Sequence, residues 1–536
     1  MSSLLIKNGM IYDGTGKDGF SADLLMKDDK IAAIGKLDFG ADEVIDAAGK
    51  AVCPGFIDIH RHCDAKFLQN PSFGEVELAQ GITTVVVGNC GMSLTPSPKA
   101  PGAAKEMYDF MEPVIGSGCG ELKLSRFPDY LDAMDKTPLP FNVASMAGTG
   151  SIKITVKGFA DTPYTKEELQ AAAELVEETL KAGAAGISMG IMYLPECYST
   201  ADEFAEMLKP AGRLGAVVTS HIRGEGDSLV PSIKEIIEIG RKAGCAVEIS
   251  HFKSCGMKNW RKDIFEAIRL IEEARASGQD VTCDFYPYDG GSTALTTMLP
   301  PVLVTGKMTE ALARLGTPEG VEEFRKASAA SYPDWDNYAV TLGWNRILIS
   351  SVYREENRRF LGLTVAEAAE RFGFEDAAAC AAHLMHADEG KTAIINMSMC
   401  QDDIDVIAKL PYSLVISDSI YADTDTPHPR MYGAFPKIIR EYVKERKLYT
   451  LAEAVHKMTQ MPAKKMKLSG RGELAVGAYA DVIVFDPDIF RDNATFTDSA
   501  RLATGLALSV IGGKIVWKDD ARVKEQKPGK NIRIKR

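Results

Sequence analysis

The middle of the chain alternates short apolar runs with longer amphipathic stretches. The short runs are rich in β-branched residues and predict strands at 52–60, 81–89, 141–148, 184–191, 215–221, 245–251, 280–287, 345–352 and 413–419. Stretches such as 165–183 and 228–244 lie between them, carry apolar residues at helical spacing and end in glycine. Repeated strand–helix alternation is typical of a parallel sheet, and about eight such units favour a closed (β/α)8 TIM-like barrel.

A different pattern marks the two ends of the chain. Residues 1–53 form short alternating apolar and polar runs, separated by Asn-Gly, Asp-Gly and Ala-Gly turns, and a similar texture returns in 470–536. We therefore expect a small β-sandwich domain built from both termini, with an α/β barrel at 54–469 between them. Clustered proline and glycine predict an insertion in the barrel at about 290–345. The basic, polar stretch 521–536 is expected to be a solvated tail.

Length and charge narrow the class of protein. The chain has 536 residues, which exceeds one ordinary domain core. Its 62 basic and 74 acidic side chains give a formal net charge of −12, which argues against a nucleic-acid partner or an anionic membrane surface. No apolar run reaches the ~18 residues that span a bilayer, and no signal peptide is evident. We therefore expect a soluble, cytoplasmic enzyme with reduced cysteines.

Half of the eight histidines stand at or just after the ends of predicted strands, namely His60, His62, His221 and His251. In a barrel the carboxyl ends of the strands form the active-site face. His60 and His62 are two residues apart, so their side chains project to the same side of an extended strand. His221 and His251 are separated by about one strand–helix unit and would reach the same mouth. Because neutral imidazole is a common transition-metal ligand, this pattern favours a metal site over four unrelated structural histidines.

Other reactive side chains stand at comparable places. Cys90 directly follows a predicted strand and is a metal ligand, a nucleophile or a buried inert thiol. Asp418 follows the last strand of the series, where a carboxylate can bind metal, act as a general base or cap a turn. Arg430 is a candidate for anion binding, the alternative being a solvated loop arginine. The remaining histidines lie in helical stretches (His383, His386 and His456) or in a loop (His428).

Together these motifs resemble those of the amidohydrolase superfamily. They are PGFIDIHRHCD, QGITTVVVGNCG, TSHIRGEGD, EISHFK, SDS followed by HPRMYGAFP, and GAYADVIVFDP. Within the superfamily the chain is similar, nearly end to end, to the D-aminoacylase family of N-acyl-D-amino-acid deacylases. The resemblance implies a small-molecule substrate. It also implies zinc-dependent hydrolysis of the linear amide bond of N-acyl-D-amino acids, which gives a D-amino acid and a carboxylate.

The resemblance also implies roles for individual residues. The ligands of a tightly bound zinc would be Cys90, His221 and His251, and a second, weaker metal position would involve His60 and His62. Asp418 would be the catalytic acid and base and would touch the metal. The residues that hold the substrate and its carboxylate would be Tyr193, Tyr286, Ser292 and Arg430.

The chain departs from the family pattern close to these residues. His-Arg-His-Cys at 60–63 stands where His-Thr-His-Asp is usual, Thr149 stands where many members have histidine, and EISHFK has Phe252 where a second histidine is commoner. These changes bear on the preferred side chain and acyl group. Two alternatives stay open, namely another amidohydrolase activity on a cyclic amide or N-carbamoyl group, and a non-catalytic, metal-free assembly protein. A homo-oligomer is also open.

Overall fold

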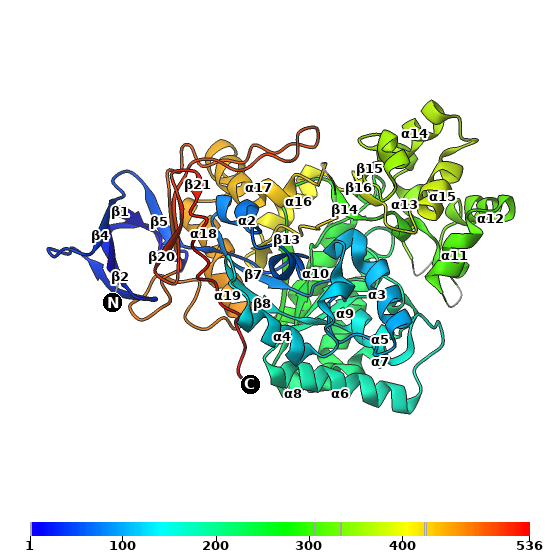
Figure 1. The fold of residues 1–536 in the computed structure, drawn as a ribbon, viewed down its shortest axis with the longest axis horizontal. Helices are drawn as coiled ribbons and strands as arrows, with labels where there is room; N and C mark the ends of the chain where they lie inside the picture. Colours follow the sequence, from blue (N-terminus) through cyan, green and yellow to red (C-terminus); the bar gives the residue numbers. More distant parts are fainter. Residues whose placement is uncertain (1–2, 305–306, 333–334, 423, 425) are drawn as a thin grey trace.

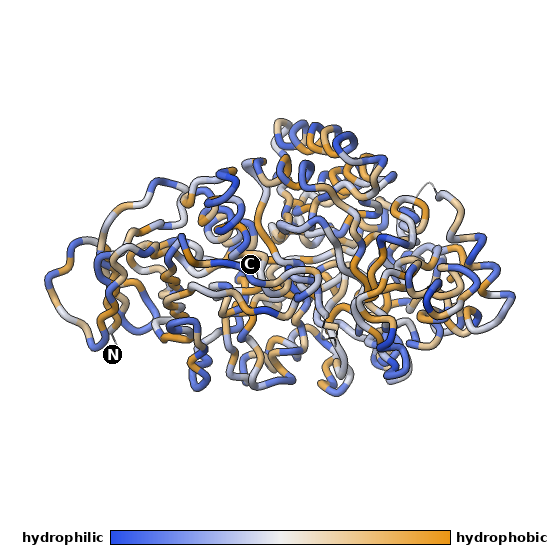
Figure 2. Tube along the Cα trace, turned by 90° about the horizontal axis from the view of Figure 1, so that it is seen from above, coloured by the Kyte–Doolittle hydropathy of each residue, from blue (hydrophilic) through white to orange (hydrophobic). Residues whose placement is uncertain are grey.

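A computed structural model describes residues 3–304, 307–332, 335–422, 424 and 426–536. The molecule is elongated, with blue and red strands from the two chain ends side by side at one end (Figure 1). The barrel forms the middle, and a group of green and yellow helices forms the other end. In Figure 2 the outer helical turns alternate between hydrophilic and hydrophobic colours, as amphipathic helices do when one face packs inward. None of the described helices is both long and apolar enough to cross a bilayer.

One nine-stranded sheet joins the two ends of the chain. Its strands are β1 (Ser3–Ile11), β2 (Phe20–Lys27), β3 (Lys30–Gly35), β4 (Glu43–Asp46), β5 (Ala51–Pro54), β18 (Val482–Phe485), β19 (Leu506–Ile511), β20 (Lys514–Lys518) and β21 (Ala521–Arg522). The antiparallel pairing of β18 with β5 connects the C-terminal strands to the N-terminal ones. The expected pairing of the two termini is therefore confirmed, whereas the boundaries at 53/54 and 469/470 stay a prediction.

The barrel strands run parallel around the centre of the molecule. They are β6 (Phe56–Asp58), β7 (Ile82–Val87), β8 (Asn142–Ser145) continued by β9 (Ala147–Gly148), β10 (Gly186–Gly190), β11 (Val217–His221), β12 (Ala246–Ile249), β13 (Val281–Phe285) and β17 (Ser413–Val415). β6-β7-β8 form one parallel ladder, and β9-β10-β11-β12-β13-β17 form the next. Every residue of β7, β10 and β11 is buried, as expected for parallel strands that are covered on both faces.

Backbone hydrogen bonds beyond the strand ends close the barrel. His62 N donates to Ser419 O at 2.9 Å, and Asp418 N donates to His60 O at 2.9 Å. A parallel bridge between Arg61 and Ser419 lies between these two bonds. The first and last barrel strands therefore meet just past β6 and β17, and the predicted barrel is confirmed.

Amphipathic helices connect and cover the barrel strands. They are α1 (Lys66–Gln69), α2 (Glu75–Ala79), α3 (Pro101–Ile115), α4 (Phe127–Lys136), α5 (Thr149–Lys157), α6 (Lys166–Ala182), α7 (Ala201–Met207), α8 (Lys209–Arg213), α9 (Leu229–Ala243), α10 (Asp263–Ala276), α16 (Gln401–Ala408), α17 (Arg430–Lys437), α18 (Leu451–Met458) and α19 (Gln460–Lys465). At the start of α6 the Thr165 hydroxyl accepts a hydrogen bond from Glu168 N, and Gly183 ends the helix in the left-handed conformation. The predicted helices are thus confirmed as α6 and α9.

The chain leaves the barrel between β13 and β17. Here β14 (Gly291–Ala294), β16 (Ala393–Asn396) and β15 (Ile347–Ser351) form an antiparallel sheet, accompanied by α11 (Met308–Arg314), α12 (Pro318–Ser328), α13 (Tyr338–Thr341), α14 (Val365–Phe372) and α15 (Ala377–Ala387). The predicted strand at 345–352 is β15, but its assignment to the alternating barrel series is wrong. A short, buried run of β-branched residues has the same sequence pattern in a barrel sheet and in a small antiparallel sheet. The pattern therefore predicts a strand but does not show to which sheet it belongs.

The C-terminal stretch is not a solvated tail, so that expectation is wrong. Val143 N in β8 donates to Lys530 O at 2.9 Å, and Ile532 N donates to Val143 O at 2.7 Å. At the chain end the Arg536 guanidinium donates to Ala185 O at 2.7 Å, just before β10. The stretch pairs with the barrel because Ile532 and Ile534 alternate with basic residues, a strand-like pattern inside a polar composition.

Buried charges hold the first and last barrel strands together. Asp58, at the end of β6, accepts hydrogen bonds from Ser417 N at 3.2 Å and from the Ser417 hydroxyl. Arg61 Nη1 donates to Asp58 at 3.2 Å, and Arg61 Nη2 lies 3.3 Å from Glu77 Oε1. Arg61 Nε donates to the Tyr421 hydroxyl oxygen at 3.0 Å. Arg61, Asp58 and Glu77 are completely buried, so each of these charges depends on the others for compensation.

The Arg61 network gives a stability prediction. Arg61→Met leaves two buried carboxylates without their cation, so the free energy of unfolding should fall by about 3–5 kcal/mol in chemical denaturation. As a control, Arg241→Met breaks an exposed pair with Glu238, whose 2.7 Å contact lies on the surface of α9, and should cost less than about 1 kcal/mol. Equal losses in the two variants would contradict the role given to Arg61.

Candidate functional site

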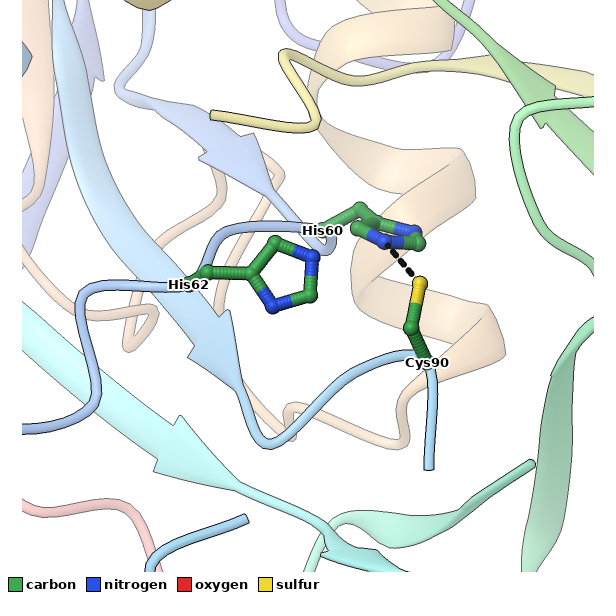
Figure 3. Close-up of side chains that lie close together, drawn as sticks. All are labelled: His60, His62 and Cys90. Atoms are coloured by element: carbon green, nitrogen blue, oxygen red, sulfur yellow. Dashed lines mark hydrogen bonds between the residues drawn. The ribbon is translucent and has the colours of Figure 1, made fainter. Parts of the chain in front are cut away.

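The histidine and cysteine side chains meet at the carboxyl ends of the barrel strands. His60 and His62 follow β6, Cys90 follows β7, His221 ends β11 and His251 follows β12. All five are buried, with at most 6% of any of them exposed. Figure 3 shows the two rings that follow β6 beside the thiol that follows β7, with the shortest contact dashed.

The donor atoms of these residues lie close enough to share a metal ion. Cys90 Sγ lies 3.2 Å from His60 Nε2, 3.5 Å from His251 Nε2 and 4.0 Å from His221 Nδ1. Ligand atoms bound to one tetrahedral zinc are roughly 3.3–3.8 Å apart. Cys90 belongs to two possible ligand sets, one completed by His60 and His62 and the other by His221 and His251. It therefore stands between two potential metal positions.

The charge state of the cluster suits a soft divalent metal. Burial lowers the pKa of His60 and of His62 to about 4, so both rings are neutral at pH 7 and can donate a lone pair. Burial likewise lowers the pKa of His221 and His251 and raises that of the Cys90 thiol. A coordinated metal is the partner that would stabilise a thiolate in these surroundings. Thiolate with neutral imidazole is a donor set that fits zinc.

Three site residues have a left-handed backbone, which is unusual for residues other than glycine. The φ angles are 53° at Cys90, 37° at His251 and 51° at Asp418. Each follows a barrel strand, and all three line the same cavity. Hydrogen bonds hold two of these turns, since His251 N donates to the Asp284 carboxylate and Asp418 N donates to His60 O. Strain of this kind at the site is compensated by the surrounding barrel.

Asp418 lies between the histidines that follow β6 and a buried arginine. Its Oδ1 is 3.4 Å from His60 Nε2 and 3.6 Å from His62 Nε2, and its Oδ2 is 2.7 Å from Arg430 Nη1. Burial alone would raise the pKa of Asp418, but the charge of Arg430 and the neighbouring imidazoles hold it well below its usual range. The carboxylate is therefore ionised and faces the histidine and cysteine side chains of the cluster.

One cavity brings the predicted substrate-binding residues to the cluster. It is lined by Tyr193, Tyr286, Ser292 and Arg430 together with Asp418 and four of the five histidine and cysteine residues above. The Tyr193 hydroxyl lies 3.3 Å from His221 Nδ1. The Arg430 guanidinium lies 4.5 Å from the centroid of the Tyr286 ring. Arg430 is only 1% exposed, so it is not a solvated loop arginine.

The other histidines serve the structure around the site or lie outside it. His428 is buried, and its Nδ1 accepts a hydrogen bond from Arg430 N at 3.0 Å. Its Nε2 therefore carries the proton and donates to Gly290 O at 2.8 Å. Through these two hydrogen bonds, His428 fixes the position of the start of α17, where Arg430 lies. As predicted, His383 and His386 lie in a helix, which is α15, and His456 lies in α18.

Three buried residues that complete the site are not among the predicted ones. Glu225 Oε1 lies 2.9 Å from His251 Nδ1 and accepts a hydrogen bond from Lys253 Nζ at 2.6 Å. Asp284, at the end of β13, has Oδ2 3.8 Å from His60 Nδ1. A carboxylate at hydrogen-bond distance, as Glu225 is from His251, orients an imidazole that could bind a metal. Asp284 lies near the end of a predicted strand, so the reasoning applied to the histidines could have identified it. Glu225 and Lys253 have no comparable signal in the sequence.

Comparison with known proteins gives full-length matches. The chain matches the model of the Amidohydrolase family over residues 43–262 and 414–517. It is 33% identical to the D-aminoacylase of Alcaligenes xylosoxydans xylosoxydans, over 97% of this chain and 95% of that protein. It is 34% identical to the N-acyl-D-glutamate deacylase of the same organism, over 96% and 93%. The structure of N-acyl-D-glutamate deacylase from Bordetella bronchiseptica, complexed with zinc and a phosphonate inhibitor, is similar with a TM-score of 0.82, 32% identity and 99% coverage of both chains.

Proposed function

Because the chain belongs to the amidohydrolase family and to its D-aminoacylase branch, we propose that the buried cluster is the metal centre of an N-acyl-D-amino-acid deacylase. The enzyme hydrolyses a linear amide bond and gives a D-amino acid and a carboxylate. The observation that carries the proposal is the position of Cys90, whose Sγ is within 4.0 Å of nitrogen atoms of His60, His221 and His251. We further propose a cytoplasmic location, in keeping with ten cysteines that are all free thiols.

The proposed metal is zinc, since the cluster combines a thiol with neutral imidazoles. Cys90, His221 and His251 would hold the tightly bound ion, and His60 with His62 would provide a second, weaker position. When bound, zinc supplies an activated water and an electrophile that polarises the scissile carbonyl. A metal-free assembly protein would have no need of such a cluster, so the convergence of these side chains in one buried place speaks against that alternative.

Asp418 is the proposed acid and base. Its carboxylate faces the same buried cavity as the metal-binding atoms and is ionised before reaction. It can therefore take a proton from the attacking water and deliver it to the departing amide nitrogen. Arg430 contacts Oδ2 of Asp418, and Oδ1 faces His60 and His62. We therefore propose that Oδ1 is the oxygen that carries the proton.

Arg430 is the proposed partner of the substrate carboxylate, assisted by Tyr286 and Ser292. Arg430 is buried, and its Nε–H has no hydrogen-bond acceptor among the described residues. Buried donors are nearly always paired, so an unpaired one beside a ligand cavity is suited to a ligand oxygen. A guanidinium also matches a carboxylate in plane and charge.

The first prediction concerns the metal. Cys90→Ala should lose most of its tightly bound zinc in plasma emission analysis and most of its activity, because two imidazoles alone hold zinc weakly. Cys245→Ala is a matched control, since Cys245 is also a buried free thiol but lies outside the cluster. Full zinc and full activity in Cys90→Ala would refute the assignment.

The second prediction concerns proton transfer. Asp418→Asn should lower kcat by at least 10²–10⁴-fold, because an amide cannot carry the proton, whereas fold and zinc content should be retained. Circular dichroism and metal analysis provide the controls. A folded, zinc-loaded variant that keeps more than about a tenth of kcat would rule out this role.

The third prediction concerns the substrate class. Arg430→Met should lower kcat/KM for N-acyl-D-amino acids by roughly 30-fold to several-thousand-fold, because the substrate carboxylate loses its buried partner. The corresponding amides have no carboxylate and should lose much less, and that smaller loss measures the contact with Asp418. Arg430→Lys should restore only part of the activity, since an ammonium cannot form the planar pair. Equal losses for acids and amides would show that Arg430 serves Asp418 alone.

A further inference from the structure

The loop that carries Cys90 packs closely against the end of β10 and the start of α5. Gly91 N donates a hydrogen bond to the Ser188 hydroxyl oxygen at 3.1 Å, and Gly91 O accepts one from Ser151 N at 3.1 Å. A side chain at Gly190 would overlap Cys90 O, so the two backbones approach more closely than any residue other than glycine allows. The position of Cys90 is therefore set by residues on two other elements.

A buried carboxyl group fills the space behind this loop. Glu196 follows β10 and is only 2% exposed, and its Oε2 accepts a hydrogen bond from Gly190 N at 3.0 Å. A methyl group at Gly91 would overlap the same oxygen. Glu196 Oε1 is hydrogen-bonded to the hydroxyl of Thr149, the first residue of α5. One carboxyl group thus connects the end of β10 with the start of α5 and packs against the residue next to Cys90.

The hydrogen bonds of Thr149 require a proton on Glu196. The Thr149 hydroxyl has a single hydrogen atom, but its oxygen lies 3.2 Å from Ser188 O and also within hydrogen-bond distance of Glu196. A neutral Glu196 supplies the second hydrogen, so that Thr149 donates to Ser188 O and accepts from Glu196. Burial raises the pKa of Glu196 to about 7, which fits a carboxyl group that keeps its proton near neutral pH. The neighbouring Lys153 ammonium donates to Pro195 O at 2.9 Å.

Resting on the proposed function, we propose that Glu196 and Thr149 are positioning residues of the metal centre, which hold the loop after β7 so that the Cys90 thiol meets the imidazoles. Neither is among the described residues that line the catalytic cavity, so both act through the backbone of the loop. Cys90 has a φ of 53°, a conformation that persists only where the surroundings enforce it. Thr149 is also a position at which the sequence departs from the family pattern, and the pair with Glu196 gives that residue a role.

The test measures how Cys90 binds metal as well as how the enzyme turns over. When cobalt replaces zinc in the wild type, a cysteine ligand should produce a thiolate-to-metal absorption band in the near ultraviolet. Thr149→Val and Glu196→Met keep the approximate shape of the side chains but remove their hydrogen bonds. Zinc should therefore bind on the order of 10-fold more weakly, and the cobalt band should weaken or shift. Excess zinc should restore much of the lost activity, because the residues that act on the substrate are unchanged.

Conservative variants and a matched control make the test specific. Glu196→Gln should bind zinc like the wild type, because its amide can donate to Thr149 and accept from Gly190 N as the neutral carboxyl group does. Thr149→Ser keeps the hydroxyl and should do the same. Thr392→Val is the control, since it removes a buried hydrogen bond of 2.6 Å to Asp388 in the insertion, and it should leave zinc affinity and the cobalt band unchanged.

Circular dichroism shows which variants are folded, and Thr149→Val alone decides the outcome if Glu196→Met does not fold. Wild-type zinc affinity and an unchanged cobalt band in the folded variants would overturn the proposal. A Glu196→Gln variant that binds zinc as weakly as Glu196→Met would overturn the assignment of the hydrogen bonds. A wild type without a thiolate band would instead refute the proposed metal centre itself.

Discussion

The site depends on the buried contact between the beginning and the end of the barrel. Asp58 binds Ser417, and Arg61 compensates Asp58 and Glu77, in a place that water does not reach. Removing one partner from such a network is strongly unfavourable, so the two strand ends are held in a single arrangement. His60 and Asp418 immediately adjoin this network, so the contact between the two strand ends also brings their side chains together. The 3.4 Å contact between them is therefore a consequence of barrel closure.

Two ion pairs flank the cluster of uncharged imidazole and thiol side chains that could bind a metal. Glu225 with Lys253 lies beside His251 on one side, and Asp418 with Arg430 lies on the other. In each pair the positive and the negative charge compensate each other, so neither pair adds a net charge beside the imidazoles. The imidazoles stay neutral because they are buried. This arrangement leaves the metal as the main source of positive charge once it is bound. The Cys90 thiolate would offset part of that charge, and the low-dielectric surroundings would strengthen the effect of the charge that remains.

Much of the site could be predicted from the sequence. The end of a strand can be recognised from a few neighbouring residues, and in a barrel all strand ends of one kind lie on the same face. His60, His221, Cys90 and Asp418 each follow an apolar run, and closure of the barrel is enough to bring them together. Residues that act through a neighbour have no such signal. Lys253 projects from a loop after β12 like many solvated lysines, and only the fold reveals that Glu225 lies 2.6 Å away. The strand β15 and the C-terminal pairing were misassigned for a related reason, since local pattern indicates a strand but not its partner.

The least regular part of the chain shapes the catalytic cavity on the side away from the metal-binding atoms. The ends of the barrel strands contribute the candidate metal ligands and the loop after β10 contributes Tyr193, whereas β14 and β16 contribute Ser292 and Asn396. Loops and insertions tolerate changes that the buried strands do not, because their side chains are not required to close the barrel. Chemistry and substrate shape are thus carried by different elements of one cavity. A barrel with one strand-end site can therefore be combined with different insertions, and in this way a single fold comes to act on different substrates.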